Sequence, residues 1–222
     1  MSRRSHAAAF DAAARLAAAA SELGVELNSH QQAMLLQYVH LLDRWSKTYN
    51  LSAIRGEESM LTHHVLDSLA IVPALARWAG GRIIRALDVG SGAGLPGVVM
   101  AIARADWFIT TVDSVGKKSA FVRQAAGELG LSNLVSLHER AELMTAATAF
   151  DLIVSRAFAT LCEFTELTQR CLAPGGVWVA MKGRVPIDEI ANLPGHRSVF
   201  HVEQLLVPGL GAERCLVWIR PN

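Results

Sequence analysis

The chain has 222 residues, of which 51% are hydrophobic and 18% are charged. This composition is enough to bury one full core and argues against a disordered chain. Lysine and arginine total 21 against 20 for aspartate and glutamate, so the net charge of +1 lacks the basic signature of most nucleic-acid-binding proteins. A nucleic-acid partner would have to be bound by a local basic patch.

The cysteines and histidines give no sign of a metal site or a disulfide framework. Cys162, Cys171 and Cys215 have no C-x-x-C spacing and no neighbouring histidine pair. His63 and His64 are adjacent and would point to different faces of a helix, so we expect no metal. Free thiols suit a reducing compartment, and we predict a cytoplasmic location.

The first third of the chain has the pattern of a helical region. Its alanine-rich start contains charged residues, which favours a helix over a signal peptide. A helix is expected after Asn28-Ser29, where apolar residues recur at helical spacing as far as Trp45. A second is expected from about Glu57 to Trp78, ended by Gly80-Gly81. No run in the sequence is judged long and apolar enough to cross a membrane.

After Gly81, short apolar runs alternate with helical stretches, which is typical of a parallel sheet with crossover helices. The expected strands are residues 83–89, 107–112, 134–138, 152–155 and 176–181. Two more, residues 199–207 and 214–219, flank Pro208-Gly209-Leu210-Gly211 and predict an antiparallel hairpin at the sheet edge. We therefore expect an α/β domain over residues 81–222, with residues 1–80 packed on it as a helical extension in one compact unit.

A glycine-rich loop follows the first expected strand. The sequence Asp88-Val89-Gly90-Ser91-Gly92-Ala93-Gly94 leads into a helix that starts near Val98. Glycines let the backbone turn tightly and let a ligand approach where a Cβ would clash. In open α/β sheets the carboxyl ends of strands are where ligands bind, so this loop is a candidate cofactor site.

Two interpretations of the loop compete. Gly92, Gly94 and Gly97 spell G-x-G-x-x-G, the fingerprint of a nicotinamide-dependent oxidoreductase. Alternatively, Asp88 stands two positions before Gly90 and a G-x-G-x-G core follows, which is the pattern of class I methyltransferases that use S-adenosylmethionine. A carboxylate is favourable beside the ammonium and sulfonium of that cofactor and would repel a pyrophosphate. The charge of Asp88 therefore favours S-adenosylmethionine.

Asp113 ends the next expected strand. In this position an acid binds the ribose hydroxyls of a nucleotide cofactor, which is the role that we expect. The alternative is that Asp113 caps the helix that follows.

Six stretches, spread in order over the chain from about Leu23 onward, resemble one known family. They are Tyr49-Asn50-Leu51, residues 64–69, residues 87–97, residues 113–118, Ser155-Arg156-Ala157-Phe158-Ala159 and Met181-Lys182-Gly183. Together they resemble the RsmG (GidB) family of bacterial methyltransferases that modify small-subunit ribosomal RNA. Departures from the family's usual residues are Lys118, His63, Ser91 and Ala93.

The resemblance implies a class I, Rossmann-like fold and transfer of a methyl group from S-adenosylmethionine to N7 of a guanine in 16S rRNA. It implies a monomer that acts on this RNA, which we expect to meet within the small ribosomal subunit. It places the adenine against Ala141 and Glu142, and Arg156 near the reacting end. The full set of expected cofactor-binding residues is Asp88, Gly90, Gly92, Gly94, Leu95, Asp113, Ala141, Glu142 and Arg156.

Guanine N7 has a free lone pair and no proton, so the reaction needs no general base. Arg156 and Lys182 end two expected strands and are the candidate catalytic residues, with Arg156 orienting the base or a phosphate. The alternatives are that Arg156 pairs with a buried carboxylate such as Asp151 and that Lys182 is a solvated surface residue.

The candidate substrate-binding residues lie partly outside the sheet; they are Asn50, His64, Lys117, Lys118 and Arg123. His64 and Asp67 are three positions apart and could instead pair with each other. Other basic side chains that could converge on RNA are Arg3, Arg4, Arg44, Lys47, Arg55 and Arg184.

Two further functions remain open: a methyltransferase of the same fold for a small molecule or a protein, and a cofactor-binding protein without catalysis.

Overall fold

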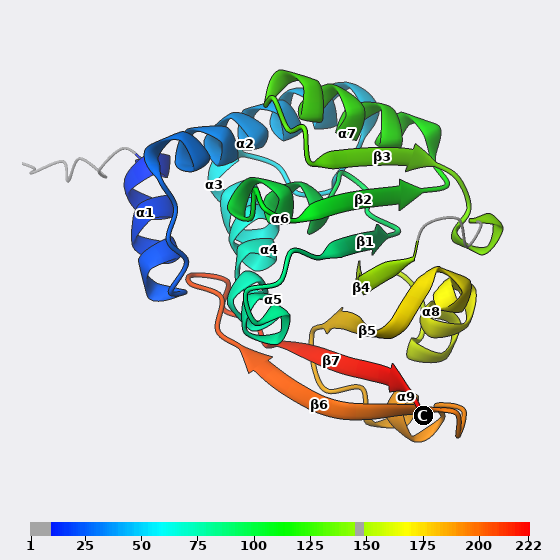
Figure 1. The fold of residues 1–222 in the computed structure, drawn as a ribbon. Helices are drawn as coiled ribbons and strands as arrows, with labels where there is room; N and C mark the ends of the chain where they lie inside the picture. The colour runs from blue at the N-terminus through cyan, green and yellow to red at the C-terminus, as the bar shows by residue number, and fades with distance from the viewer. Residues whose placement is uncertain (1–9, 145–148) are drawn as a thin grey trace, which may run out of the picture.

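The computed structural model describes residues 10–144 and 149–222, and within them one seven-stranded sheet has the order β3-β2-β1-β4-β5-β7-β6 (Figure 1). Strands β1 to β5 run parallel, while β7 is antiparallel to both β5 and β6. The expected parallel sheet with a C-terminal antiparallel hairpin is confirmed. The strands are β1 Arg85–Val89, β2 Phe108–Asp113, β3 Leu134–His138, β4 Phe150–Arg156, β5 Leu172–Lys182, β6 Arg197–Leu205 and β7 Arg214–Pro221.

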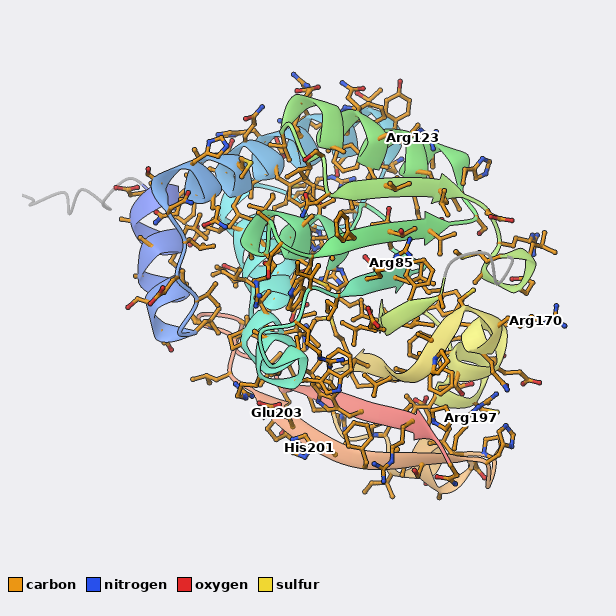
Figure 2. All side chains as sticks on the ribbon, viewed as in Figure 1. Arg85, Arg123, Arg170, Arg197, His201 and Glu203 are labelled. Carbon is orange, nitrogen blue, oxygen red and sulfur yellow. The ribbon has the colours of Figure 1, made fainter. Side chains whose placement is uncertain are left out.

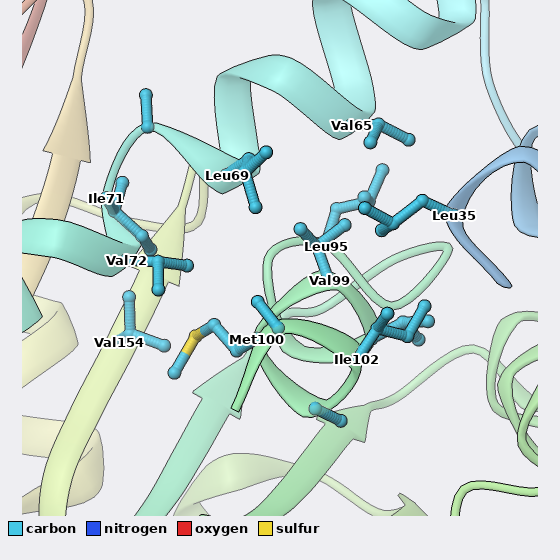
Figure 3. Close-up of a cluster of buried hydrophobic side chains, with 14 of the residues drawn as sticks. Leu35, Val65, Leu69, Ile71, Val72, Leu95, Val99, Met100, Ile102 and Val154 are labelled. Atoms are coloured by element: carbon cyan, nitrogen blue, oxygen red, sulfur yellow. The ribbon is translucent and has the colours of Figure 1, made fainter. Parts of the chain in front are cut away.

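Helices cover both faces of the sheet, each over its own apolar core. One face carries α6 and α7, with α2 and α4 as a further layer outside α6, and α5 packs directly on the sheet, where its Trp78 lies against Trp218 of β7. The close-up of this core shows Leu35 and Leu69 from the outer layer against Val99 and Ile102 of α6 (Figure 3). The other face carries α8 and α9. The helices are α1 Ala12–Glu22, α2 Ser29–Tyr49, α3 Glu57–Met60, α4 Asp67–Leu69, α5 Val72–Ala79, α6 Gly97–Ala103, α7 Gly116–Glu128, α8 Leu161–Thr168 and α9 Ile187–Ala191.

Helix α2 begins where the sequence places it. Asn28 and Gln31 form a reciprocal cap, because Oδ1 of Asn28 accepts the N–H of Gln31 at 2.9 Å and Oε1 of Gln31 accepts the N–H of Asn28 at 3.0 Å. The amide of Gln31 also donates to the carbonyl oxygen of Ile102 at 2.9 Å. The cap therefore also fixes α2 to the end of α6.

The prediction of a single helix over residues 57–78 is wrong in detail. It consists of α3, a π-helical turn at Leu61–Leu66, α4 and, after a break at residues 70–71, α5, which ends at Gly80 in the left-handed conformation. The break has a cause in Pro73, which starts α5 and cannot continue a preceding helix. The segment Glu57–Ala79 is also long and apolar enough to cross a membrane, contrary to expectation, but 78% of its most apolar window is buried inside the protein.

Strand β5 begins four residues before the expected start. The sequence Ala173-Pro174-Gly175-Gly176 resembles a turn, yet it extends the strand, and Leu172 pairs with Phe150 of β4. The register shifts between Phe150 and Leu152, as in a β-bulge. This irregular pairing accommodates the proline and the glycines without ending the strand.

Candidate functional site

The loop between β1 and α6 needs its glycines for two different reasons. Gly92 has a φ of +58° with open space where a Cβ would be, so the loop leaves room for a ligand there. At Gly94 an added Cβ would lie 2.5 Å from Cγ2 of Val98, and at Gly97 it would lie 2.6 Å from Cγ2 of Thr111. Gly94 and Gly97 therefore serve the packing of the loop on the sheet and α6.

Asp88, in the strand before this loop, fixes the far end of the loop by a hydrogen bond. Its side chain is fully buried, and its Oδ2 accepts the N–H of Gly97 at 2.8 Å. Oδ1 has no hydrogen-bond partner among the described residues. Burial raises the pKa of Asp88 to about 7, against the lowering effects of the Gly97 N–H and Arg156. Within residues 10–144 and 149–222, Asp88 lines neither of the two hollows described below, so its contact with the cofactor's ammonium group stays a prediction.

Asp113, the last residue of β2, contacts the glycine loop, the backbone before α7 and a lysine on α7. Oδ2 accepts the N–H of Gly92 at 2.9 Å and lies 3.7 Å from Nζ of Lys118, while Oδ1 accepts the N–H of Val115 at 2.8 Å. The alternative role at the start of α7 is thus partly right, since Val115 directly precedes that helix. Asp113 also lines a hollow in the surface, so its contact with the ribose hydroxyls stays a prediction.

That hollow, which we call the α7 hollow, has a volume of about 350 Å³ and lies beside the start of α7. It brings together the residues expected to bind the ribose and those expected to bind the adenine. Its lining includes Gly90, Asp113, Lys118, Ala141, Glu142 and Phe158. The grouping supports a nucleoside site.

A second hollow of about 540 Å³, the arginine hollow, adjoins the first, because Gly90 and Ala157 line both. Its lining includes Gly92, Leu95, His64, Asp67, Arg156, Lys182 and Arg214. Ala157 has a φ of +53°, a conformation that a residue with a Cβ seldom adopts. An elongated molecule such as S-adenosylmethionine would have to pass Gly90 to place its nucleoside in the α7 hollow and its amino acid toward the arginine hollow.

Arg156 ends β4 and enters the arginine hollow, as expected. Its Nη1 donates to Oδ2 of Asp67 at 3.0 Å and to the carbonyl oxygen of His63 at 3.1 Å. Asp67 is 2% exposed and also accepts from Nε of Arg214 at 2.7 Å. The alternative that Arg156 pairs with a buried carboxylate is confirmed, but the acid is Asp67 and not Asp151, whose carboxylate accepts the backbone N–H of Arg85.

Sequence reasoning missed Arg214 altogether. This residue begins β7 directly after the hairpin turn, with nothing in its neighbourhood to mark it. Its partner Asp67 is 147 residues away in the chain. A buried acid needs a cationic partner, so a search for the partner of Asp67 could have found Arg214.

His64 lies in the arginine hollow but does not pair with Asp67, so that alternative is wrong. Its Nε2 is 2.7 Å from Oγ of Ser52, and the residue is 8% exposed. Burial lowers the pKa of His64 to about 4, with a further lowering from Arg156. His64 is therefore neutral at physiological pH.

Lys182 is held at the edge of the same hollow. Its Nζ donates to both carboxylate oxygens of Glu189 on α9, at 3.0 and 2.9 Å, and to the carbonyl oxygen of Ala159 at 3.3 Å. The alternative of a solvated lysine is wrong, because this charge is paired and half-buried.

The other expected substrate residues are spread over the surface. Asn50 ends α2 with a φ of +50° and accepts from Nη2 of Arg55, and within the described residues it lines neither hollow. Lys117 and Arg123 are exposed on α7, on which Figure 2 labels Arg123. Of the remaining basic candidates, Arg44 pairs with Glu128, Lys47 pairs with Asp43, and Arg3 and Arg4 lie outside the described residues.

The fold is shared with solved methyltransferases. TrmN from Thermus thermophilus matches with a TM-score of 0.55 and 21% identity, over 80% of this chain and 53% of that chain. A methyltransferase of Geobacter sulfurreducens, solved with S-adenosyl-L-homocysteine, matches with a TM-score of 0.51 and 15% identity, over 68% and 90%. At these identities the likeness concerns the fold alone, and it confirms the expected class I architecture.

Sequence comparisons give the family. A protein of Acidovorax ebreus (strain TPSY) named ribosomal RNA small subunit methyltransferase G is 55% identical over 210 residues, 91% of this chain and 92% of that protein. Its namesake in Methylibium petroleiphilum is 52% identical over 215 residues, 96% and 97% of the two chains. The family model GidB, described as rRNA small subunit methyltransferase G, matches residues 31–217. This chain therefore belongs to the GidB family.

Proposed function

We propose that this protein transfers the methyl group of S-adenosylmethionine to N7 of a guanine in 16S rRNA. Membership of the GidB family makes the chain an S-adenosylmethionine-dependent methyltransferase of ribosomal RNA. The oxidoreductase interpretation of the glycine loop is therefore wrong. The guanine atom and the RNA within its ribosomal subunit are the finer parts that we propose.

The observation that carries the proposal is the pair of arginines that Asp67 holds beside the glycine loop. Arg156 and Arg214 present N–H donors in the arginine hollow, next to Gly92. Arginine donors suit the O6 acceptor of guanine, which neighbours N7, and they suit a phosphate. Donors bound to O6 would hold the base and leave the lone pair of N7 free to accept the methyl group.

The surrounding side chains suit a nucleophile that needs no deprotonation. Asp67 is committed to two arginines, Lys182 to Glu189, and His64 has a pKa of about 4, which makes it a weak base at neutral pH. When bound, S-adenosylmethionine supplies the methyl group on its sulfonium, and guanine N7 supplies the electron pair. The chain's own contribution is to bind, orient and exclude water.

The expected residues would divide the work between binding the cofactor, orienting the base and holding the wider substrate. Asp113 would accept the ribose hydroxyls, and Ala141 and Glu142 would flank the adenine in the α7 hollow. Arg156 would orient the base, with Lys182 closing the edge of the arginine hollow. For the wider substrate we propose contacts from Asn50, His64, Lys117, Lys118 and Arg123, the last three on the helix beside the cofactor site.

We also propose that the enzyme acts as a cytoplasmic monomer on the small ribosomal subunit and needs no metal. In this arrangement residues 1–80 form the helical extension, whose His64 and Asp67 complete the wall of the site, and residues 81–222 form the catalytic domain. Phosphate contacts would make RNA binding fall as salt rises.

The test uses purified protein, tritiated S-adenosylmethionine and small subunits from cells that lack this protein. Label on 16S rRNA at a guanine that becomes sensitive to N7-specific cleavage would support the enzyme, substrate and atom together. Label on RNA at another atom would overturn the N7 assignment. Label that appears only on a protein or a small molecule would overturn the choice of substrate, and Asp113→Ala protein serves as the control with a damaged cofactor site.

A further inference from the structure

A row of aromatic side chains, tilted against one another, crosses the hairpin half of the sheet, away from the cofactor site. Trp218 on β7 lies between Trp78 of α5 and Phe200 of β6, with ring centroids 6.3 and 6.2 Å apart. The guanidinium of Arg82 lies 4.9 Å from the Trp78 ring, and that of Arg220 lies 5.3 Å from the Phe200 ring. Three aromatic rings thus form a row with an arginine at each end, which we call the aromatic row.

A groove of about 640 Å³ has the three rings of the aromatic row in its lining, which comes from α5, β6 and β7. Figure 2 labels His201 and Glu203 on the β6 side of it. Phe200 is 40% exposed, and the side chain of Arg77 is 63% exposed. Trp218 at the centre of the row is buried and packs the hairpin on α5, whereas Phe200 and part of Trp78 stay open to water. The groove is lined by Arg77 and Trp78 from α5, by Phe200, His201 and Glu203 from β6, and by Trp218 from β7.

The charges around the groove suit a polyanion. Arg77 lies in the lining, and Arg82 and Arg220 end the row. The acid Glu203 forms an ion pair with Arg77 and lies 3.9 Å from Nε2 of His201, so its charge is already offset. Two arginines at the ends of the row remain to attract phosphates.

The groove and the arginine hollow share one face of the sheet. Arg214 lines the hollow and Trp218 lines the groove, and both belong to β7. Side chains four residues apart in a strand lie on the same face, about 13 Å from each other along it. The helical segment over this face likewise contributes Asp67 to the hollow and Trp78 to the groove. An RNA strand bound in the hollow would reach the groove within a few nucleotides.

We propose that this groove binds unpaired nucleobases of the RNA substrate, at a distance from the guanine that is methylated. Exposed aromatic rings with flanking arginines are the chemistry by which proteins hold single-stranded RNA, through base stacking and phosphate contacts. Phe200 and Trp78 provide the stacking surface, and Arg82 and Arg220 provide the cations. The inference rests on the proposed action on rRNA and extends it with a second contact surface.

The test compares two groove variants with two matched controls. Phe200→Ala removes an exposed ring of the groove, and Phe108→Ala removes a ring on β2 that is 59% exposed. Arg220→Ala removes an exposed positive charge at the end of the aromatic row, and Arg170→Ala removes an exposed positive charge outside the row and the groove. The measurements are the Kd for a 16S rRNA transcript by filter binding, KM and kcat with small subunits, and the Kd for S-adenosylmethionine by calorimetry.

We expect Phe200→Ala to raise the Kd for rRNA and the KM for subunits roughly tenfold, the effect of one lost stacking contact. Arg220→Ala should weaken binding less and should reduce the salt dependence by about one phosphate contact. Neither variant should change kcat or the affinity for S-adenosylmethionine, and both controls should behave as wild type. If Phe200→Ala melts at a lower temperature, Arg220→Ala alone decides the test.

Three results would overturn the inference, and they differ from one another. Unchanged rRNA affinity and KM in both groove variants would remove the groove from RNA binding while leaving the methyl transfer intact. A raised KM for subunits with unchanged affinity for naked rRNA would assign the groove to a ribosomal protein. Wild-type protein that labels no rRNA would instead refute the proposed function, and the groove's role would fall with it.

Discussion

Oδ2 of Asp67 accepts a hydrogen bond from Nη1 of Arg156 at 3.0 Å, and this contact joins the N-terminal helices to the end of β4. The other carboxylate oxygen binds Arg214 of β7, so a single buried acid sets the position of two cations in the arginine hollow. Asp67 is the charged partner of both arginines, and a carboxylate holds a guanidinium more strongly than the carbonyl oxygens of His63 and Glu213, which also accept from them.

Asp67→Asn should therefore both destabilise the protein and impair methyl transfer. Removing the charge leaves two half-buried arginines side by side, which costs about 3 kcal/mol in the free energy of unfolding. Urea titration measures this loss, and Asp106→Asn is the control, because its exposed pair with Arg104 contributes under about 1 kcal/mol. Equal stability of the two variants would contradict the role of Asp67.

Arg156→Ala should lower kcat on the order of a hundredfold, as expected for loss of a preorganised donor in the site. It should leave the affinity for S-adenosylmethionine nearly unchanged, because the α7 hollow keeps its lining. Single-turnover methylation and calorimetry separate the two quantities. Equal losses in both would show that Arg156 holds the cofactor rather than orienting the base.

Asp113→Ala should weaken the binding of S-adenosylmethionine by about tenfold or more, the value of one lost charge-assisted hydrogen bond. The substitution also frees the N–H groups of Gly92 and Val115, so the loop loses an anchor. Calorimetry with Asp106→Ala as a control for a lost surface charge measures the effect. Wild-type affinity in Asp113→Ala would remove this residue from the cofactor site.

His64 should give the protein a pH-dependent stability that His64→Gln lacks. The pKa of His64 is lowered to about 4, so between pH 6.5 and 4 the unfolded chain takes up a proton that the folded chain does not. Stability is therefore lost as the pH falls through this window, by roughly 3 kcal/mol from this group.

Urea unfolding from pH 4 to pH 7 would measure the difference between wild type and His64→Gln. Asp88 contributes in the opposite sense, because its pKa is raised, but it is common to both proteins and cancels in the comparison. The exposed His201→Gln serves as the control. Parallel pH profiles for wild type and His64→Gln would contradict the buried, neutral state of His64.

The sheet could be predicted from sequence because its signals are local. Short apolar runs and the turn at Pro208-Gly209 locate the strands, and the loop from Gly90 marks the ligand-binding end. Strand β5 was placed too short, since Pro174-Gly175-Gly176 resembles a turn and only pairing with β4 makes it a strand. Local pattern cannot report a partner strand.

The candidate site was predictable in part for the same reason. Arg156, Lys182 and Asp113 end strands of a parallel sheet, and topology alone brings such ends together. Arg214 and the partner of Arg156 were not predictable, because both depend on how the segment around Asp67 packs over the sheet. Long-range ion pairs leave no periodic trace in a sequence.

The π-helical turn at Leu61–Leu66 has a consequence for how this site could have arisen. A π turn holds one residue more than an α turn over nearly the same rotation about the axis, so it absorbs an inserted residue without turning the side chains that follow. The helix after the bulge therefore still directs Asp67 toward Arg156 and Arg214. One inserted codon in an ancestral helix would thus have widened the backbone around His63, whose carbonyl oxygen accepts from Arg156, and left the carboxylate in place.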